Sequence, residues 1–362
     1  MDKKLLDAAR AYSVDEHPFA WGGPAGEGIL RVEPEDFFVD EDLGFEPRGE
    51  GEHLYLQVEK RGLNTPDVAR ALARGAKLRA GDVSYAGLKD RHAVTRQWFS
   101  LYLPGKPDPS VELLEGDGYQ VLNARRHPRK LRRGALWGNY FRIRLRQWSG
   151  DVDRLAGILE GISQMGFPNY FGAQRFGRGN SNLIGAAGLF NGQRERRRTQ
   201  KGFYLSAARS WLFNQVLARR VADATWNLGL DGEVYQKGEA RGLFTSDGTD
   251  EDLEDRCRRL EIHPTGPLPG MAARVMPSGV ARVVENEVLD ANRSWVEGLE
   301  QQRVDADRRA LRALAHDLEW QWDGQDLLLA FRLRRGAFAT ALLREIGYVE
   351  HDRQSAKDPN HG

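Results

Sequence analysis

The strongest constraint on the fold is the order in which two kinds of periodicity follow each other along the chain. Up to about Asp151, short segments such as Phe37–Asp42 alternate between apolar and polar residues or are rich in β-forming residues, which predicts strands. The stretch after Asp151 is mainly helical, and Leu205–Ala222 has the apolar spacing of an amphipathic helix. Strand-like alternation returns at Leu318–Trp322. A β-containing domain with a second domain inserted in it would give this order, and two consecutive domains are the alternative.

The remaining segments follow the same pattern. Within Tyr140–Gln147, apolar Phe141, Ile143 and Leu145 alternate with arginines, which predicts a half-buried strand with a basic outer face. A helix is expected to begin at Thr65, which would cap it, with Pro66 as its first residue. Pro- and Gly-rich loops are expected from the end of the long helix to Val280. Further strands are expected at Gly28–Val32, Leu54–Lys60, Val83–Ala86, Gln97–Leu103, Tyr119–Arg125 and Leu327–Leu333, and further helices at Asp151–Met165, Asp305–Leu318 and Ala337–Ile346.

Length and composition limit the class of protein. The 362 residues exceed what one hydrophobic core usually holds, so two domains are expected. The single cysteine, Cys257, excludes an intramolecular disulfide and favours a cytoplasmic protein. No apolar run reaches the roughly 18–20 residues that span a bilayer, so no membrane partner is expected. The histidines have no zinc-binding spacing and one cysteine cannot form a thiolate site, so no metal is expected.

The charge is nearly balanced overall but unevenly distributed. The formal net charge is +1, yet seven basic residues lie between Arg125 and Arg133, and a second basic run lies between Arg194 and Lys201. Segregated basic clusters in a neutral chain are typical of a protein that binds a polyanion on one face. The alternative is that each run is a solvated loop, and for a single run the two interpretations weigh about equally.

Several longer motifs resemble one enzyme family. The stretch Tyr85-Ala-Gly-Leu-Lys-Asp-Arg-His-Ala-Val-Thr-Arg-Gln-Trp-Phe99 is similar to the central motif of the TruD family of pseudouridine synthases. The blocks Pro168-Asn-Tyr-Phe-Gly-Ala-Gln-Arg-Phe-Gly177 and Pro34-Glu-Asp-Phe-Phe-Val39 resemble the same family. Further matches, in the expected order, lie at Gly134–Phe141, Leu205–Gln215 and Gly336–Thr340. Because they cover nearly the whole chain, the resemblance is far more specific than a single short motif.

The resemblance implies a fold and a reaction. The expected fold class is α+β, with a catalytic domain (1–167 and 316–362) built on a mixed or antiparallel sheet flanked by helices, and an inserted α/β TRUD domain (168–315). The family converts uridine to pseudouridine in tRNA, at position 13 in the D-stem region. Because the product is an isomer of the substrate, the reaction implies no cofactor and no metal. The family also suggests a monomer.

The resemblance assigns the catalytic carboxylate to Asp90. It would act as a nucleophile at C1′ of the ribose or at C6 of the base, and the sequence leaves both open. Without the motif, an aspartate between two strands is usually a turn residue. The family places a basic residue at the position of Arg31, so we expect Arg31 to form an ion pair with Asp90 and orient it. The alternative for Arg31 is an ordinary strand-surface charge.

Other residues are expected to contact the RNA. The resemblance places Phe37, Asn139 and Phe338 at substrate-binding positions, where an extruded uracil needs apolar walls and hydrogen bonds to its polar edge. Lys89, beside the aspartate, and Phe141 are also expected to contact the substrate. Core packing is the alternative for the three phenylalanines, and for Phe141 the two weigh about equally. Phosphate contacts are expected from Arg125, Arg126, Arg129, Lys130, Arg132 and Arg133.

Two other functions are compatible with parts of the sequence. A non-catalytic RNA-binding protein could retain the same scaffold, although the intact motif around Asp90 argues against it. A nucleotide-dependent enzyme could use the Gly-rich block Asn169–Asn182 for phosphate, but that block lacks the Gly-Lys-Ser/Thr ending of a P-loop.

Overall fold

The computed structural model describes residues 2–238, 242–245 and 252–351, which divide into two compact units. The first, which we call the sheet unit, comprises Ala25–Val152, Ala315–Gly336 and residues 347–351. The second, which we call the helical unit, comprises Met1–Pro24, Asp153–Leu314 and Ala337–Ile346. Each unit is therefore assembled from segments that are far apart in the sequence.

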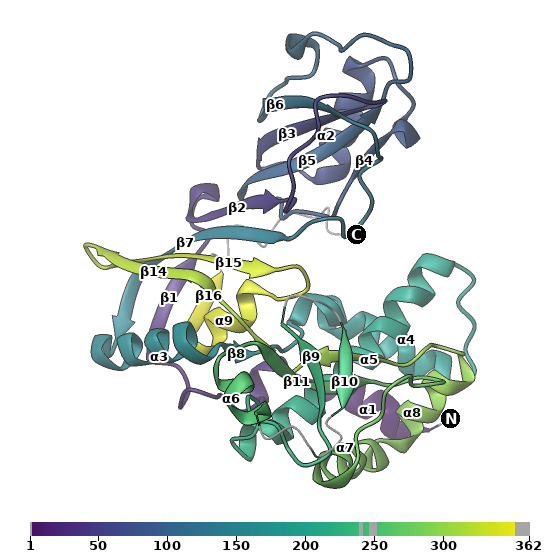
Figure 1. Cartoon of the computed structure of the whole chain (residues 1–362), viewed down its shortest axis with the longest axis vertical. Helices are drawn as coiled ribbons and strands as arrows, with labels where there is room; N and C mark the ends of the chain where they lie inside the picture. The colour runs from purple at the N-terminus through teal and green to yellow at the C-terminus, as the bar shows by residue number, and fades with distance from the viewer. Residues whose placement is uncertain (1, 239–241, 246–251, 352–362) are drawn as a thin grey trace. The chain divides into compact units, whose positions relative to one another are not determined.

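Ten described strands form one sheet in the sheet unit (Figure 1). Seven follow the order β14–β15–β7–β2–β5–β3–β6, while β1 pairs with β7 and β16, and β4 pairs with β5. The β1–β16 and β2–β5 pairs are parallel and the others antiparallel, so the sheet is mixed, as expected. The strands are β1 (Gly26–Leu30), β2 (Phe37–Asp42), β3 (His53–Arg61), β4 (Val83–Tyr85), β5 (Val94–Tyr102), β6 (Tyr119–His127), β7 (Gly138–Gly150), β14 (His316–Asp323), β15 (Asp326–Arg334) and β16 (Gly347–His351).

Strand β7 confirms the predicted half-buried pattern. Phe141, Ile143 and Leu145 are buried between the neighbouring strands β2 and β15. The arginines on the other face are partly neutralised, because Arg144 donates from Nε to the Asp326 carboxylate at 2.6 Å. Arg146 likewise donates from Nε to Asp36 at 3.0 Å. The alternation thus separates an apolar face from a basic face that ion pairs hold in place.

Helix α2 (Thr65–Gly75) covers one face of β3 and β5 (Figure 1). Its Val68 and Leu72 pack with Leu56 and Phe99 in one buried cluster, as the helical spacing predicted. The N-cap is Asn64, one residue earlier than expected. The hydroxyl of Thr65 instead donates to Gln97 Oε1 at 2.9 Å, which ties the start of the helix to β5.

The helical unit is organised around the long helix α5 (Arg198–Ala222), which shares a buried cluster with α1, α4 and α8 (Figure 1). Its Trp211, Leu212 and Phe213 are buried there, in agreement with the predicted amphipathic helix. A sheet of order β10–β9–β11–β12 and a β8–β13 pair complete the unit. The other elements are α1 (Lys3–Ala11), α3 (Val152–Met165), β8 (Phe167–Pro168), α4 (Ser181–Phe190), β9 (Val234–Lys237), β10 (Leu243–Thr245), α6 (Leu253–Arg258), β11 (Ile262–Leu268), α7 (Gly279–Ala291), α8 (Arg293–Gln301), β12 (Asp307–Ala310), β13 (Arg312–Ala313) and α9 (Ala339–Ile346).

The helix predicted over Asp305–Leu318 is wrong. The segment forms β12, β13 and the start of β14. The guanidinium of Arg308 donates from Nε to Thr265 Oγ1 at 2.8 Å and pairs with the buried carboxylate of Glu285. Arg312 is also buried and donates from Nε to His263 Nδ1 at 3.1 Å. These tertiary contacts with β11 and α7 outweigh the helix-forming composition of the segment.

The loops expected up to Val280 also contain regular structure. Strands β9, β10 and β11 and helix α6 lie there, although part of the segment falls outside the described residues. Pro264 and Pro267 lie inside β11, and prolines in a short strand conceal the alternation that predicts one. Among the described helices, none is long and apolar enough to cross a membrane.

The compact units do not follow the expected domain boundaries. Residues 1–24, 153–167 and 337–346 were expected in the catalytic domain, yet they group with the helical unit. Compact units are defined by contacts within one chain, whereas a catalytic domain and its insertion are defined by comparison across a family. The division into 1–167 with 316–362 and 168–315 therefore stays a prediction.

Candidate active site

Asp90 lies in the connection between β4 and β5, and its main chain is tied to strand β3. The ammonium of Lys60 donates to the Asp90 carbonyl and to the Leu63 carbonyl, each at 2.8 Å. Lys60 is buried, and this burial lowers its pKa to about 8, although the negative charge of Asp90 acts in the opposite direction. A neutral amine still has two hydrogens, so both carbonyls keep their donor in either protonation state.

Arg31 forms the predicted ion pair with Asp90. Its Nη2 lies 2.8 Å from Oδ2 of the carboxylate. The guanidinium carbon also lies 4.3 Å from the ring centroid of Phe37, so the side chain is held on one side by a charge and on another by an aromatic face. Arg31 has a φ of 64°, a left-handed conformation that is costly for a residue with a Cβ.

The carboxylate of Asp90 keeps one oxygen available. Its side chain is 41% exposed, while that of Arg31 is 14% exposed. Oδ2 accepts the arginine hydrogen bond, and no described residue donates to Oδ1. The arrangement thus holds an accessible carboxylate oxygen in a fixed orientation, which suits a nucleophile.

Lys89 neutralises a different carboxylate. Its ammonium lies 2.5 Å from Oε2 of Glu41, which is buried on β2. The other oxygen of Glu41 accepts the backbone N–H of Trp98 at 3.2 Å. The backbone N–H of Lys89 donates to Thr65 Oγ1 at 3.0 Å. These contacts fix the residue before Asp90 from two sides, and the substrate contact expected of Lys89 stays a prediction.

Strand register brings several predicted residues to one face of the sheet. Phe37 lies opposite Ile143, and Glu41 lies opposite Asn139, so these side chains and that of Phe141 share a face. The links from Arg31, Lys60 and Lys89 hold the Asp90 turn at this face. Oδ1 of Asn139 is buried and has no hydrogen-bond partner among the described residues, so it is an acceptor available to a ligand.

Phe141 and Phe338 have different surroundings. Phe141 is buried and stacks on Phe331, with ring centroids 5.4 Å apart, and its ring centroid lies 6.1 Å from that of Phe37 in an edge-to-face arrangement. This is a core position, which favours packing for Phe141. Phe338 belongs to the helical unit, where its ring lies 5.9 Å from that of Phe171. Its expected substrate contact stays a prediction.

A family model for tRNA pseudouridine synthase D (TruD) matches residues 13–196 and 191–346 of this chain. The chain belongs to the TruD family. A tRNA pseudouridine synthase D from Methylococcus capsulatus is 47% identical over 346 residues, which is 95% of this chain and 97% of the relative. The enzyme of the same name from Hydrogenovibrio crunogenus is 43% identical over 93% of this chain and 98% of its own length.

The fold is that of the family as well. The crystal structure of a Methanosarcina mazei protein assigned as tRNA pseudouridine synthase D (TruD) superimposes with a TM-score of 0.72. It covers 95% of this chain and 98% of its own, at 22% identity. The expected α+β fold of the TruD family is therefore confirmed, and the chain is an enzyme of this family of isomerases.

The basic run of this TruD-family chain separates into residues with different surroundings. Arg126 donates to the Asp108 carboxylate from Nε at 2.6 Å, and its other nitrogens donate to the carbonyls of Gly51, Leu103 and Lys106. A phosphate would have to displace these partners. Arg125 pairs with Glu46 at 3.4 Å. The exposed members without a carboxylate partner among the described residues are Arg129, Lys130, Arg132 and Arg133.

Two site residues were not predicted. Glu41 and Lys60 are buried charges that hold Lys89 and the Asp90 main chain. Their signal lay in the alternation, because Glu41 follows Phe37 and Val39 at inward-facing positions of β2. Lys60 likewise follows inward-facing apolar residues of β3. A charge in such a position needs a partner, and the partners of these two residues lie in the connection that contains Lys89 and Asp90. Within the described residues, no three His, Cys, Asp or Glu side chains are grouped as a metal site requires.

Proposed function

We propose that this TruD-family enzyme isomerises uridine to pseudouridine in tRNA, at position 13 of the D-stem region, with Asp90 as nucleophile. The observation that supports this most is the state of the Asp90 carboxylate. One oxygen is held by Arg31 at 2.8 Å, and no described residue donates to the other, accessible oxygen. A nucleophile needs this combination of fixed orientation and an available oxygen.

In the proposed reaction, the bond from ribose C1′ to uracil N1 breaks and a bond from C1′ to C5 forms. Asp90 attacks either C1′ or C6 and is released when the new bond is complete, so the nucleotide is bound covalently in between. The C5 hydrogen leaves as a proton, and a proton replaces it at N1. Electrons and atoms balance without an oxidant, reductant or cofactor. The side chain of Phe141 has no basic atom, so this residue does not accept the C5 proton.

The base would bind after leaving its stack in the RNA. Phe37 is proposed to provide an apolar wall for the uracil. For Phe338, the family resemblance supports a proposed contact with the substrate. Asn139 is proposed to accept a hydrogen bond from the imide N3–H, because its Oδ1 is buried and unpartnered within the described residues. Arg31 is proposed to remain bound to Asp90 throughout and thus acts as a positioning residue.

The proposal includes the setting of the reaction. We propose that the enzyme acts as a cytoplasmic monomer, with residues 1–167 and 316–362 as the catalytic domain and 168–315 as the insertion. The exposed basic residues between Arg129 and Arg133 would contact tRNA phosphates, since structured RNA is held mainly by shape and charge.

The test is to map the modified position. Unmodified tRNA transcripts with uridine at position 13 are incubated with the enzyme, and pseudouridine is located by mass spectrometry of nuclease fragments. We expect pseudouridine at position 13 alone and none in a transcript that carries cytidine there. Modification at a different position would refute the proposed target, and binding without modification would refute the proposed reaction.

A further inference from the structure

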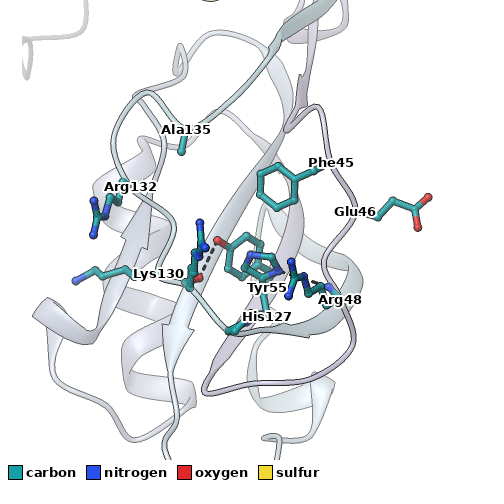
Figure 2. Close-up of a pocket in the computed structure, with 10 residues that line it drawn as sticks. Phe45, Glu46, Arg48, Tyr55, His127, Lys130, Arg132 and Ala135 are labelled. Carbon is teal, nitrogen blue, oxygen red and sulfur yellow. Dashed lines mark hydrogen bonds between the residues drawn. The ribbon is translucent and has the colours of Figure 1, made fainter.

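A cavity that contains none of the Asp90-site residues lies within the sheet unit (Figure 2). Its volume is about 670 Å³, which is within the range of small-molecule sites, roughly 300–1,000 Å³. The connection between β2 and β3 and the connection between β6 and β7 form its walls, and Tyr55 of β3 lies at its base. We call it the Tyr55 pocket.

The Tyr55 pocket lies on the other side of β3 from the contact with Asp90. Lys60, which donates to the Asp90 carbonyl, is at an even-numbered position of β3, as are Leu54, Leu56 and Val58. Tyr55 is at an odd-numbered position of the same strand. Successive side chains of a strand point to opposite faces of the sheet. A ligand in the Tyr55 pocket would therefore not occupy the place of the target uridine.

The pocket has an aromatic side. The ring centroid of Phe45 lies 5.3 Å from that of His127 and 6.5 Å from that of Tyr55. Phe45 is 44% exposed, while the other two are buried beneath it (Figure 2). An exposed aromatic face supported by buried rings is the surface on which an unstacked nucleobase packs in RNA-binding proteins.

Positively charged residues form other parts of the pocket lining. Arg48, Lys130 and Arg132 line the pocket, and none of the three has a carboxylate partner among the described residues, although Nζ of Lys130 donates to the Gly81 carbonyl at 3.4 Å. In Figure 2, Arg48 lies beside the rings of Tyr55 and His127, whereas Lys130 and Arg132 extend on the side away from Phe45. The one acidic residue of the lining, Glu46, is turned outward and pairs with Arg125. Uncompensated cations around a concave surface attract an anion. Together with Phe45 they match a nucleotide, which has a flat base and a phosphate.

The walls of the pocket are fixed before any ligand arrives. The hydroxyl of Tyr55 donates to the Arg129 carbonyl at 3.0 Å, and the backbone N–H of Arg48 donates to Nδ1 of His127 at 3.4 Å. The second bond leaves the ring proton of neutral His127 on Nε2, as a donor. Burial lowers the pKa of His127, with Arg48 and Arg129 contributing, which favours this neutral form. A preformed site loses little entropy on binding.

We propose that the Tyr55 pocket binds one unpaired nucleotide of the RNA substrate other than the target uridine. Its base packs on Phe45, and its phosphate is held by Arg48, Lys130 and Arg132. This inference rests on the proposed function, because it takes tRNA as the RNA. It adds a second point of attachment on the opposite sheet face, so that the enzyme would recognise an unpaired nucleotide at a fixed distance from the modified one.

The first test is tRNA affinity. Phe45→Ala removes the platform, and since one stacked base contributes on the order of 10-fold or more in affinity, we expect Kd for tRNA to rise by about 10-fold. Phe45→Trp keeps an aromatic face and should bind as the wild type does. Trp322→Ala, at a similarly exposed aromatic residue of β14, is the matched control and should leave Kd unchanged. At saturating tRNA, kcat of Phe45→Ala should stay within about twofold, because stacking supplies affinity rather than chemistry.

The second test concerns charge. The double variant Lys130→Gln and Arg132→Gln should flatten the dependence of log Kd on log salt by up to about 0.7–0.9, since the variant loses the contact with one phosphate. Arg258→Gln with Arg259→Gln removes the same charge at the C-terminal end of α6, where both arginines pair with carboxylates, and should leave the slope unchanged. An equal slope in wild type and the Lys130 and Arg132 variant would refute the phosphate contact.

Titration of free UMP and AMP into the wild type decides whether the Tyr55 pocket binds a nucleotide of the RNA or a free nucleotide. Weak millimolar binding without competition against tRNA supports the RNA nucleotide. Micromolar binding that Phe45→Ala abolishes, with unchanged tRNA affinity, would overturn the proposal in favour of a free nucleotide. No effect of Phe45→Ala on either ligand would overturn it altogether. If tRNA binding depends on Phe45 but the enzyme forms no pseudouridine, the proposal for the Tyr55 pocket is supported and the proposed function is refuted.

Discussion

Replacing Arg31 with glycine separates the stability of the fold from the activity of the site. Arg31 is held at a φ of 64°, which is unfavourable for arginine and easy for glycine. The same side chain makes the 2.8 Å ion pair with Asp90 and packs on Phe37. The substitution therefore relieves backbone strain while it removes the group that orients the proposed nucleophile.

The effects on stability nearly cancel. Relief of the left-handed conformation of Arg31 raises the free energy of unfolding of the variant by about 1–2 kcal/mol. Against this, the half-exposed ion pair is worth about 0.2–1 kcal/mol and the contact with Phe37 about 0.5–1 kcal/mol. The greater freedom of glycine in the unfolded chain costs about 0.5–1 kcal/mol more. We expect the free energy of unfolding of Arg31→Gly to lie within about 1 kcal/mol of the wild type.

The effect on catalysis is much larger. A hydrogen bond to a charged group is worth about 1.5–3 kcal/mol, and if it acts in the transition state its loss lowers kcat/KM by about 10- to 150-fold. Arg31→Lys keeps the charge and should retain most of the activity. The control is Arg303→Gly, which should leave kcat/KM unchanged. The backbone of Arg303 is also in the left-handed conformation, with a φ of 55°.

The assay combines urea unfolding with single-turnover kinetics on unmodified tRNA, for the wild type and the three variants. Unchanged kcat/KM in Arg31→Gly would refute the positioning role of Arg31. A loss of several kcal/mol of stability would refute the account of its backbone strain.

Three further predictions address other parts of the site. Lys60→Met should become less stable relative to the wild type as pH rises from about 8 to 10.5. Over this range the unfolded wild type binds the lysine proton and the folded wild type, with a Lys60 pKa near 8, does not, so the free energy of unfolding of the wild type rises with pH. A pH-independent difference in urea unfolding would contradict this. Asn139→Ala should lower kcat/KM about 10-fold with an unchanged melting temperature, because its buried Oδ1 has no partner to lose among the described residues; equal kcat/KM would exclude the uracil contact. Arg126→Ala should lower the free energy of unfolding by about 1–3 kcal/mol without changing the salt dependence of tRNA binding, whereas Arg133→Ala should do the reverse, and the opposite pattern would exchange their roles.

The sequence was informative where local pattern and family spacing agree. The strand Tyr140–Gln147 was predictable because its alternation is complete, and the Arg31–Asp90 pair because the family motif places a basic residue at that position. The segment Asp305–Leu318 was not, because Arg308 and Arg312 find their partners on β11 and α7, which no local window contains.

The Tyr55 pocket shows why some sites cannot be found from sequence. Phe45, Tyr55 and His127 come from separate segments, and they meet because β3 and β6 pair in a register that places His53 opposite His127. Residues in a loop beside a strand have no periodicity that indicates which partner they will face. The buried charges Glu41 and Lys60 were different, since their inward positions were already visible in the alternation.

The most direct test of the central claim uses tRNA labelled with tritium at C5 of its uridines. Pseudouridine formation at a labelled uridine expels the C5 hydrogen, so tritium release reports the reaction itself. We expect release by the wild type and none by Asp90→Ala, with equal tRNA affinity for both proteins. Release by Asp90→Ala at the wild-type rate would contradict the role of Asp90, and no release by a wild type that binds tRNA would contradict the reaction.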